Sequence, residues 1–570
     1  MAGAFQVSGQ NAAALFTLKL HRGDGMTLLA MNWKNGKPPQ DFVGFAIEYK
    51  EPGGQKFFSL KNRLSFLGAD GNVNANSLST RLSPIQKFRW VHFPRNAELP
   101  GEFVYHVSPV FMNEADELSY GEPQEAAIEL RRETYPGILN VTFTRGFVAS
   151  QAFVDRYQSA GPISQLLPPN ADEGLGFVPT HPKSKEALGW MGFEARHAIL
   201  EVLDKAIADK KAEVRVVAYD LSEPDVVSRL EKLGPRLQVI IDNDGAHAKP
   251  KSGEAQAAKR LRVTAGKANV KRQHMGKLQH NKTIVVDGPK VQAVVCGSTN
   301  FTWRGFFVQS NNAIVLRGKS AVKTFLAAFN DYWAHDDPAG FGKTASAKLT
   351  PLGLTGINAR VGFSPYAKKN QLLATIAEDI GKATSCVFYS LAFLYQTKGP
   401  IREAITQLTK DDKIFIYGIS DRKVGGLDLL KPDGNLAPVR PAALEKNVPE
   451  PFKSEPTGGG GNRLHHKFVV IDFDKPTARV YMGSYNFSGA ADASNGEQLL
   501  LIRDRRIAVS YVIEALRIFD HYYFRVVQQE AKDAKTELVL SPPPRAAGEK
   551  PWWADDWSNA RRCRDRELFS

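Results

Sequence analysis

The chain has 570 residues, of which 43% are hydrophobic and 24% charged, and its formal net charge is +14. This length exceeds what a single hydrophobic core supports, so we expect several domains. No stretch approaches the roughly 20 consecutive apolar residues of a membrane-spanning helix, which argues against an integral membrane protein. The positive charge favours a polyanionic partner, either nucleic acid or an anionic lipid surface.

The start of the chain and its cysteines indicate a compartment. The opening stretch "MAGAFQVSGQNAAALF" has no basic residue ahead of its apolar run, so it is not typical of a signal peptide. Cys296, Cys386 and Cys563 are widely scattered, which argues against a disulfide framework and against a zinc site. We therefore expect a cytoplasmic enzyme, with export by a route that needs no cleaved signal left open.

Residues 1–136 are predicted to form a small all-β sandwich. The stretches "DFVGFAIEYK" (41–50) and "GEFVYHVSPVFM" (101–112) alternate apolar and small or polar residues, the period of a half-buried strand. In this pattern the segment resembles a fibronectin type III or immunoglobulin-like module. We expect it to serve docking or spacing, with a protein partner as its ligand.

From residue 137 the pattern changes to alternating helices and strands, and the same order occurs twice. In the first series "HAILEVLDKAIAD" (197–209) has helical spacing and "LQVIIDN" (237–243) is a continuous apolar run, typical of a strand covered on both faces. Each series ends in a strand that carries a histidine, "LQHNKTIVVD" or "RLHHKFVVID". We interpret this as an internal duplication, with halves at 137–348 and 349–532. Residues 533–570 form a tail rich in Pro and Trp that is expected to pack back on the body.

The two histidine strands share one spacing of chemically active residues. His280 is followed by Lys282 and Asp287, and in the second copy the residues are His465, Lys467 and Asp472. Each strand is then followed by a small turn, "GSTN" (297–300) or "GSYN" (483–486). One such match can arise by chance, but two copies at equivalent points of a duplication are poorly explained by coincidence.

This double pattern resembles the phospholipase D superfamily, whose signature is H-x-K-x4-D followed by G-S-x-N, and the resemblance covers residues 137 to about 530. It implies two α/β halves, each a mixed sheet flanked by helices, that share one active site across a pseudo-two-fold interface. It also implies phosphodiester chemistry without metal or cofactor, for which a monomer is sufficient. Members include lipid phosphodiesterases, phospholipid synthases, nucleases and a few inactive relatives.

Strand geometry assigns side chains to this chemistry. Because side chains alternate, each catalytic histidine shares a face with its lysine, while Asn281 and His466 point away. One imidazole can attack phosphorus while the other protonates the leaving oxygen, which gives a phosphohistidine that water resolves. The expected phosphate-binding groups are the two lysines and the polar residues of the two turns, namely Asn300, Asn486, Ser298 and Ser484. By family analogy, Asp287 and Asp472 brace the backbone.

One departure from the family pattern affects the two histidines. "SNGEQLLL" offers Glu497 as the acidic residue that hydrogen-bonds a catalytic imidazole, whereas "SNNAIVL" has Ala313 in that place, unless Asn312 or another residue substitutes. We expect Glu497 near His465, where it would raise the pKa of a general acid. The first motif commonly supplies the nucleophile in such relatives, so His280 is expected to attack.

The substrate is left open between a phospholipid and a nucleic acid. Aromatic stretches at 301–307 and 521–524 favour the lipid, although core packing explains them as well. The basic stretch 258–277, which holds seven lysines and arginines and no acidic residue, favours the nucleic acid. A third hypothesis is a non-catalytic scaffold that binds phosphate or nucleic acid through a degenerate first half.

Overall fold

The computed structural model describes residues 3–68, 78–130, 133–169, 174–395, 397–421, 426–439 and 464–570. The chain divides into two compact units. The first comprises Met1–Arg132, Val509–Asp520 and Phe524–Ser570, and the second comprises Glu133–Ala508 and His521–Tyr523. Among the described helices, none combines the length and the apolar character that crossing a membrane requires.

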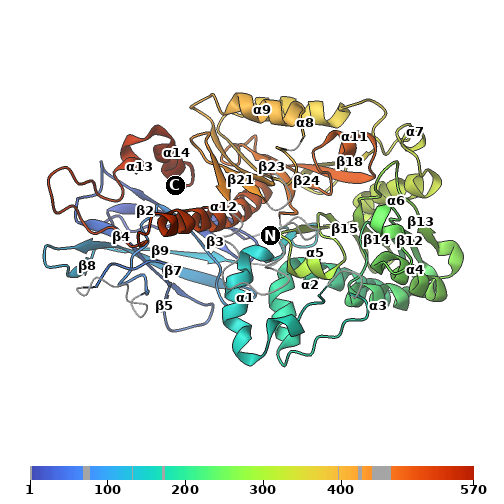
Figure 1. The fold of residues 1–570 in the computed structure, drawn as a ribbon, viewed down its shortest axis with the longest axis horizontal. Coiled ribbons are helices and arrows are strands. Elements are labelled where there is room, and N and C mark those ends of the chain that lie inside the picture. Colours follow the sequence, from blue (N-terminus) through green and yellow to red (C-terminus); the bar gives the residue numbers. More distant parts are fainter. Residues whose placement is uncertain are drawn as a thin grey trace. The chain divides into compact units, whose positions relative to one another are not determined.

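The first unit contains two antiparallel sheets. One has the order β1 (Gln6–Ser8), β2 (Phe16–Arg22), β3 (Thr27–Trp33) and β6 (Arg89–His92). The other has the order β5 (Phe58–Ser59), β4 (Phe42–Lys50), β7 (Glu102–Met112) and β8 (Leu118–Tyr120), with β9 (Gln124–Glu129) paired to β7. These strands are drawn in blue in Figure 1.

Both sheets of the first unit contribute to one core. Phe16 and Leu29 of the first sheet and Phe45 and Phe103 of the second belong to the same buried cluster. This is the packing of a β-sandwich, as the alternating pattern predicted. The tail ends in α13 (Asp555–Ser558) and α14 (Ala560–Leu568), and Trp553 is buried in the same cluster.

The second unit contains two larger sheets, one in each half. The first has the order β10 (Leu139–Phe143), β16 (Asn312–Arg317), β15 (Gln292–Gly297), β14 (Lys282–Asp287), β11 (Glu213–Ala218), β12 (Leu237–Ile241) and β13 (Val270–Arg272). The second has the order β17 (Thr350–Pro351), β18 (Asn358–Ser364), β25 (Glu497–Arg503), β24 (Arg479–Gly483), β23 (Lys467–Ile471), β19 (Cys386–Leu391), β20 (Phe415–Asp421), β21 (Leu427–Leu430) and β22 (Leu436–Val439).

Strand order confirms the duplication. In both sheets the histidine strand, β14 or β23, lies between a following antiparallel strand and a preceding strand, β11 or β19. That preceding strand in turn pairs in parallel with the next strand, β12 or β20. Both sheets are therefore mixed, and the two halves present their histidine strands in equivalent places.

Helices flank the two sheets. Because they cover the sheet faces, the central strands are apolar throughout. The first half contains α1 (Ser150–Tyr157), α2 (Ser184–Ala208), α3 (Pro224–Leu233), α4 (Gly253–Thr264), α5 (Trp303–Phe307), α6 (Lys319–Ala334) and α7 (Pro338–Phe341). The second contains α8 (Gln371–Gly381), α9 (Pro400–Leu408), α11 (Gly489–Ala493) and the start of α12 (Arg505–Asp533). Figure 1 shows α8 and α9 side by side. The predicted helix in 197–209 is the end of α2, which buries Ile199, Leu203 and Ala206.

Candidate active site

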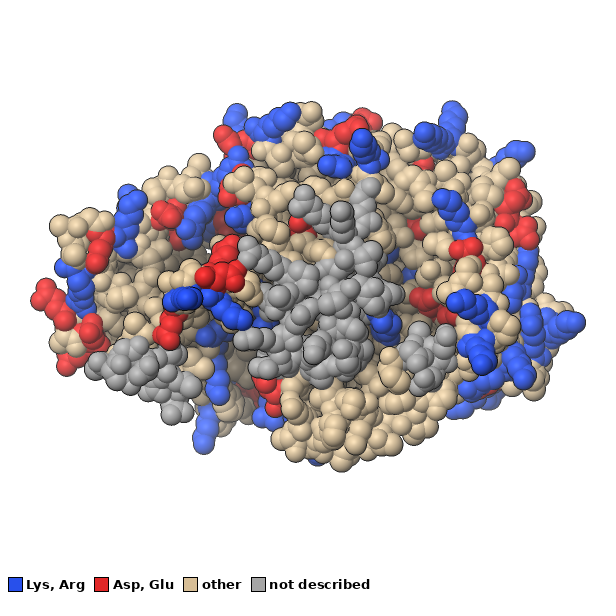
Figure 2. Space-filling view, in the orientation of Figure 1, with Lys and Arg blue, Asp and Glu red and all other residues tan. Residues whose placement is uncertain are grey.

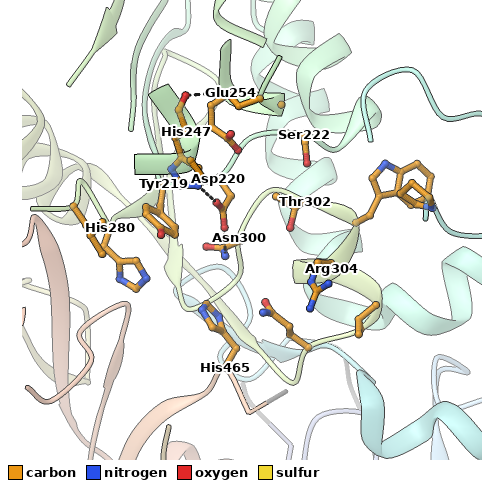
Figure 3. Close-up of a pocket in the computed structure, with 18 of the residues that line it drawn as sticks. Tyr219, Asp220, Ser222, His247, Glu254, His280, Asn300, Thr302, Arg304 and His465 are labelled. Carbon is orange, nitrogen blue, oxygen red and sulfur yellow. Dashed lines mark hydrogen bonds and ion pairs between the residues drawn. The ribbon is translucent and has the colours of Figure 1, made fainter. Parts of the chain in front are cut away.

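The two histidine strands bring their histidines to one cavity. His280 and His465 each lie two residues before the lysine that starts a buried strand, Lys282 of β14 or Lys467 of β23. Their ring centroids are 6.3 Å apart and the ring planes are inclined by 69°. Both side chains line the same cavity of about 480 Å³. Figure 3 shows the two imidazoles together on one side of it.

Backbone and side-chain hydrogen bonds join the two halves around these histidines. The His465 amide donates to the carbonyl of Ser310 (3.2 Å), and the Gly496 amide donates to that of Leu278 (2.8 Å). The side-chain amide of Gln498 donates to the carbonyl of Gly297 (2.9 Å). The interface between the halves therefore positions the histidines relative to one another.

Each imidazole is held by the opposite half. Nδ1 of His280 lies 3.1 Å from Oε1 of Glu497, which belongs to the second half. Nδ1 of His465 lies 3.0 Å from the carbonyl oxygen of Ser298 and 2.8 Å from Oδ1 of Asn311, both of the first half. The expectation that Glu497 serves His465 is therefore wrong, because the partners cross the pseudo-two-fold interface. In both rings Nδ1 faces a group of the opposite half, so Nε2 is the atom that can meet phosphorus or a proton.

The strand register also corrects the residue that replaces the acid in the first half. Ala313 lies opposite the glycine of the GSTN turn, and the corresponding residue opposite the glycine of GSYN is Leu499. Glu497 lies two residues before Leu499, so its counterpart lies two residues before Ala313 and is Asn311. The sequence comparison was wrong by two positions because it aligned the letters of "SNN" with those of "SNG".

Lys282 and Lys467 are both fully buried and make the same contact. Nζ of Lys282 donates to the carbonyl of His280 (2.6 Å), and Nζ of Lys467 donates to that of His465 (2.7 Å). The Lys282 ammonium also lies 4.6 Å from the centroid of the Tyr219 ring. Burial lowers the pKa of Lys282 to about 7, against the opposing charges of nearby carboxylates, and it lowers the pKa of Lys467 as well. A buried ammonium of this kind is stabilised by an anion.

The pKa values of the two imidazoles are also lowered. Burial, together with the charge of Lys282, lowers the pKa of His280 to about 4, although Glu497 opposes this. Burial, with Lys467 and Lys282, lowers the pKa of His465 well below its usual value. Without a bound anion both rings are therefore neutral at neutral pH, and a bound phosphate would favour their charged forms.

The two asparagines of the turns lie on the cavity wall. Asn300 donates through Nδ2 to the carboxylate of Asp220. The backbone amide of Asn486 donates to Oε2 of Glu497 (2.7 Å). The Oδ1 atoms of both asparagines are buried and have no hydrogen-bond partner within the described part of the chain. Each asparagine therefore retains capacity to bind a ligand.

The hydroxyls of the two turn serines, expected to bind phosphate, make internal hydrogen bonds. The Ser298 hydroxyl donates to Oδ1 of Asn311 (2.9 Å) and accepts from the Asn312 amide (3.0 Å). The Ser484 hydroxyl accepts from the Gln498 amide (3.0 Å). Both side chains are fully buried and neither lines the cavity. They tie each turn to the neighbouring strand.

The two motif aspartates differ from one another. Asp472 accepts from the backbone amides of Thr384, Ser385 and Cys386 at 2.8–3.2 Å, so it braces the turn before β19. Asp287 accepts from the side chain of Gln292 (3.2 Å).

The residue between histidine and lysine in the second motif points away from the site: His466 packs edge-on against Phe143 and Phe468.

A cluster of carboxylates and one histidine was missed in the sequence. Asp220, His247 and Glu254 line the cavity, and their ligand atoms all lie within 4.8 Å of one another, close enough to hold a metal ion. His247 is already hydrogen-bonded on both sides, with Asp220 (2.8 Å) and with Asp242 (2.8 Å). Burial lowers its pKa, but these two bonds outweigh burial and raise it to about 10. The position of Asp220 just after β11, the strand beside β14, is the signal that could have identified it.

The basic stretch 258–277 is partly exposed, whereas the aromatic residues of 301–307 are buried. In 258–277, Lys259, Arg262, Lys267 and Lys277 are exposed. Arg260 pairs with Glu231, and the other cations make internal contacts. Figure 2 shows lysines and arginines gathered where Figure 1 draws α4 and β13. The aromatics of 301–307 are buried, and of these Trp303 lines the cavity.

Comparisons with known proteins agree with this site. Residues 202–333 match the family model described as cardiolipin synthase, PLD-like domain. A phospholipase D of Rickettsia felis is 44% identical over 48 residues, which is 8% of this chain and 22% of that protein, and a phospholipase D of Rickettsia prowazekii matches to the same extent. The chain thus spans less than a quarter of the length of these curated relatives.

Solved structures show a weaker likeness. Phosphatidylserine synthase of Haemophilus influenzae is 13% identical, with 60% of this chain and 92% of that chain covered and a TM-score of 0.42. A phospholipase D family member of Salmonella typhimurium is 26% identical, with 25% of this chain and 87% of that chain covered and a TM-score of 0.20. The family model and the curated relatives agree with the resemblance seen in the sequence: residues 202–333 are similar to a PLD-like domain of the phospholipase D superfamily.

Proposed function

We propose that the protein is a phosphodiesterase that cleaves a phospholipid or a nucleic acid through a covalent phosphohistidine. The observation that carries this proposal is the meeting of two His-Lys pairs in one cavity, with the imidazole centroids 6.3 Å apart. Two imidazoles at this separation can flank one phosphoryl group, one on the side of attack and one on the side of departure.

In the first step, neutral His280 attacks phosphorus through Nε2. The bond from phosphorus to the leaving oxygen breaks, and His465 transfers the proton on its Nε2 to that oxygen. The product alcohol leaves, and the phosphoryl group stays on His280. The carboxylate of Glu497, 3.1 Å from Nδ1 of His280, stabilises the positive charge that the ring gains.

In the second step, water attacks the phosphohistidine. His465, now neutral, takes a proton from the water as the new phosphorus–oxygen bond forms and the phosphorus–nitrogen bond breaks. This returns His280 to its neutral form and His465 to its charged form. Lys282 and Lys467 stabilise the charge on the non-bridging oxygens in both steps, as the cationic groups of phosphoryl transfer do.

The test is turnover by purified full-length protein, in EDTA, on mixed phospholipid vesicles, single-stranded DNA and RNA. We expect one of these classes to be cleaved, and His280→Ala to abolish cleavage. His335→Ala is the matched control, because His335 lies in the same unit but outside the cavity lining. Binding of a phosphodiester with no turnover on any class would contradict the proposal and favour the non-catalytic scaffold.

A further inference from the structure

A single carboxylate performs two tasks in the second half. Glu497 accepts through Oε2 from the backbone amide of Asn486 (2.7 Å), and its Oε1 lies 3.1 Å from Nδ1 of His280. It therefore fixes the asparagine of the GSYN turn and also faces a motif imidazole. The counterpart of Glu497 in the first half is Asn311, which is neutral and contacts His465 (2.8 Å). That position thus orients an imidazole but supplies no charge.

In the first half a different carboxylate fixes the turn asparagine. Nδ2 of Asn300 donates to Oδ2 of Asp220, which lies two residues after the end of β11. In both sheets the motif lysine pairs with the residue two positions before this site, so the equivalent of Asp220 in the second half is Phe393. Both side chains line the cavity. Asp220 is therefore a feature of the first half, where it takes over one task of Glu497.

A histidine joins Asp220 to a second carboxylate. Nε2 of His247 lies 2.8 Å from Oδ1 of Asp220, and Nδ1 lies 2.8 Å from Oδ2 of Asp242. Because both ring nitrogens face carboxylates, both donate and the ring is a cation. Burial lowers the pKa of His247, but these bonds and the nearby charge of Glu254 raise it to about 10. The charges of this cluster are therefore paired internally.

Asp242 extends the set of hydrogen bonds to the backbone beside His280. It is fully buried directly after β12, and its Oδ1 accepts from the amide of Gln279 (2.6 Å), the residue immediately before His280. One carboxylate thus fixes both the start of the histidine strand and the ring of His247. A continuous set of contacts, which we name the His247 bridge, runs from Gln279 through Asp242, His247 and Asp220 to Asn300.

The His247 bridge also packs behind the first His-Lys pair. The centroid of the Tyr219 ring lies 4.6 Å from that of His247 and 4.6 Å from that of His280. Figure 3 shows Tyr219 between these two imidazoles. The ammonium of Lys282 lies 4.6 Å from the same ring centroid. Burial lowers the pKa of Lys282, and the two aspartates of the bridge are among the charges that oppose this.

We infer that His247 is a positioning residue of the phosphodiester site, which holds Asn300 and the backbone before His280 in place through its two aspartates. The inference rests on the proposed function and adds a residue that acts through others. Without the cation, Asp220 and Asp242 would be carboxylates that have lost their counter-ion, which is costly in a buried place. Asp220 would then take up a proton or turn away, and Asn300 would lose its acceptor.

The first experiment measures steady-state turnover of the full-length protein and of His247→Ala on the best phosphodiester. We expect kcat to fall by about 100-fold, the cost of a slightly misplaced reacting group, with KM little changed because both motif lysines remain. Since His247 lines the cavity, added imidazole can reach the vacated place and should restore part of kcat. His274→Ala is the matched control, because His274 is exposed, contacts Asn243 and lies outside the cavity lining.

The second experiment tests the bridge by NMR, without turnover. Asp242→Asn keeps an acceptor for the Gln279 amide but removes one of the charges beside His247. The pKa of His247, about 10 in the unmodified protein, should fall by about 1–3 units. The side-chain amide signal of Asn300 should follow the same titration, because Asp220 loses its counter-ion when the ring loses its proton.

Several charged or titratable groups face His247 and enter this titration. They are Asp220 and Tyr219 after β11, Asp242 after β12, Glu254 of α4 and Arg272 of β13, which donates to the carbonyl of His247 (2.6 Å). Asp242→Asn leaves all the others in place. Glu403→Gln on α9, an exposed carboxylate of the same unit, is the matched control and should move neither signal.

The outcomes separate the bridge from the proposed function. Unchanged kcat in a folded His247→Ala variant would overturn the inference. A loss of kcat that imidazole does not restore, with the Asn300 signal unmoved, would overturn it as well and leave His247 a structural residue. If His247→Ala does not fold, the titration of Asp242→Asn decides, and an Asn300 signal that does not follow His247 overturns the inference. If the unmodified protein turns over no phosphodiester, the proposed function falls, and the same titration decides the bridge.

Discussion

The carboxylate of Glu497 contacts His280 across the interface between the halves, 3.1 Å from Nδ1, and the amide of Asn311 takes the equivalent place beside His465. The two imidazoles are therefore chemically different although their strands are equivalent. A carboxylate stabilises positive charge on its imidazole, whereas a neutral amide orients the ring with little effect on that charge. The ring that becomes covalently bonded to phosphorus gains positive charge, so the difference favours His280 as the nucleophile.

The first prediction concerns Glu497. Glu497→Gln retains the shape of the side chain but removes the charge that stabilises the His280 imidazolium. We expect kcat to fall by about 100-fold, a typical loss when one preorganised electrostatic group is removed, with KM little changed. Steady-state kinetics on the best substrate measure the two constants. Glu403→Gln is the control, and a loss confined to KM would contradict the role.

The second prediction concerns Asn311. Asn311→Asp places a carboxylate 2.8 Å from Nδ1 of His465, where the first half now has an amide. The new charge should raise the pKa of His465 by about 1–3 units. The signal of that imidazole in an NMR titration should move accordingly, while the signal of His280 moves less. An unchanged titration of His465 would contradict the crossed arrangement of partners.

The fold and the meeting of the two motif histidines in one cavity could be predicted because both depend on local patterns. Alternating apolar residues predicted the sandwich, and continuous apolar runs predicted covered strands such as β14 and β23. The spacing of His280 and Lys282 fixes which side chains share a face, because strand geometry is regular. The spacing within each motif therefore predicts the arrangement of the histidine and the lysine within that half.

Contacts between the halves could not be predicted in the same way. Glu497 contacts His280 because of the way in which the two sheets meet. The local spacing of residues in either half does not predict this contact. The counterpart Asn311 was missed because strand register, not letter similarity, decides equivalence. His247 and Glu254 come from a loop and a helix start, and they join the site through tertiary packing alone.

The third prediction concerns proton uptake on binding. Burial lowers the pKa of Lys282 to about 7, so this lysine is partly neutral at pH 7, and a bound anion favours its charged form. Binding of dimethyl phosphate, which keeps one charge over this range, should therefore take up protons at pH 7 and weaken as pH rises above about 7. Calorimetry in buffers of different ionisation enthalpy measures the uptake.

The control for proton uptake is a second lysine. Lys282→Met should reduce the uptake and weaken binding, whereas Lys267→Met, on the exposed surface near α4, should leave both unchanged. Binding without proton exchange in the unmodified protein would contradict the lowered pKa of Lys282.

The fourth prediction concerns chelation. In the proposed mechanism Lys282 and Lys467 supply the positive charge that phosphoryl transfer needs. The imidazole of His247, which lies beside these groups in the cavity, carries a proton between the carboxylates of Asp220 and Asp242. Turnover should therefore be unchanged after dialysis against EDTA. Loss of turnover that returns on adding Zn²⁺ or Mg²⁺ would contradict the metal-independent mechanism.

The last prediction assigns the two histidines. If His280 is the nucleophile, His280→Ala should abolish turnover and form no covalent adduct. His465→Asn removes only the proton donor, and a leaving group of low pKa departs without one. This variant should therefore still form a phosphohistidine from a p-nitrophenyl phosphodiester, and the adduct should accumulate because water is no longer activated.

Mass spectrometry of an acid-free quenched reaction locates the phosphate. We expect it on the peptide that contains His280, in the unmodified protein at low occupancy and in His465→Asn at high occupancy. A phosphate on the His465 peptide would reverse the roles and make Glu497 the group that keeps His280 protonated as the acid. Both results are compatible with a phosphodiesterase, so this experiment tests the asymmetry of the two imidazoles and nothing else.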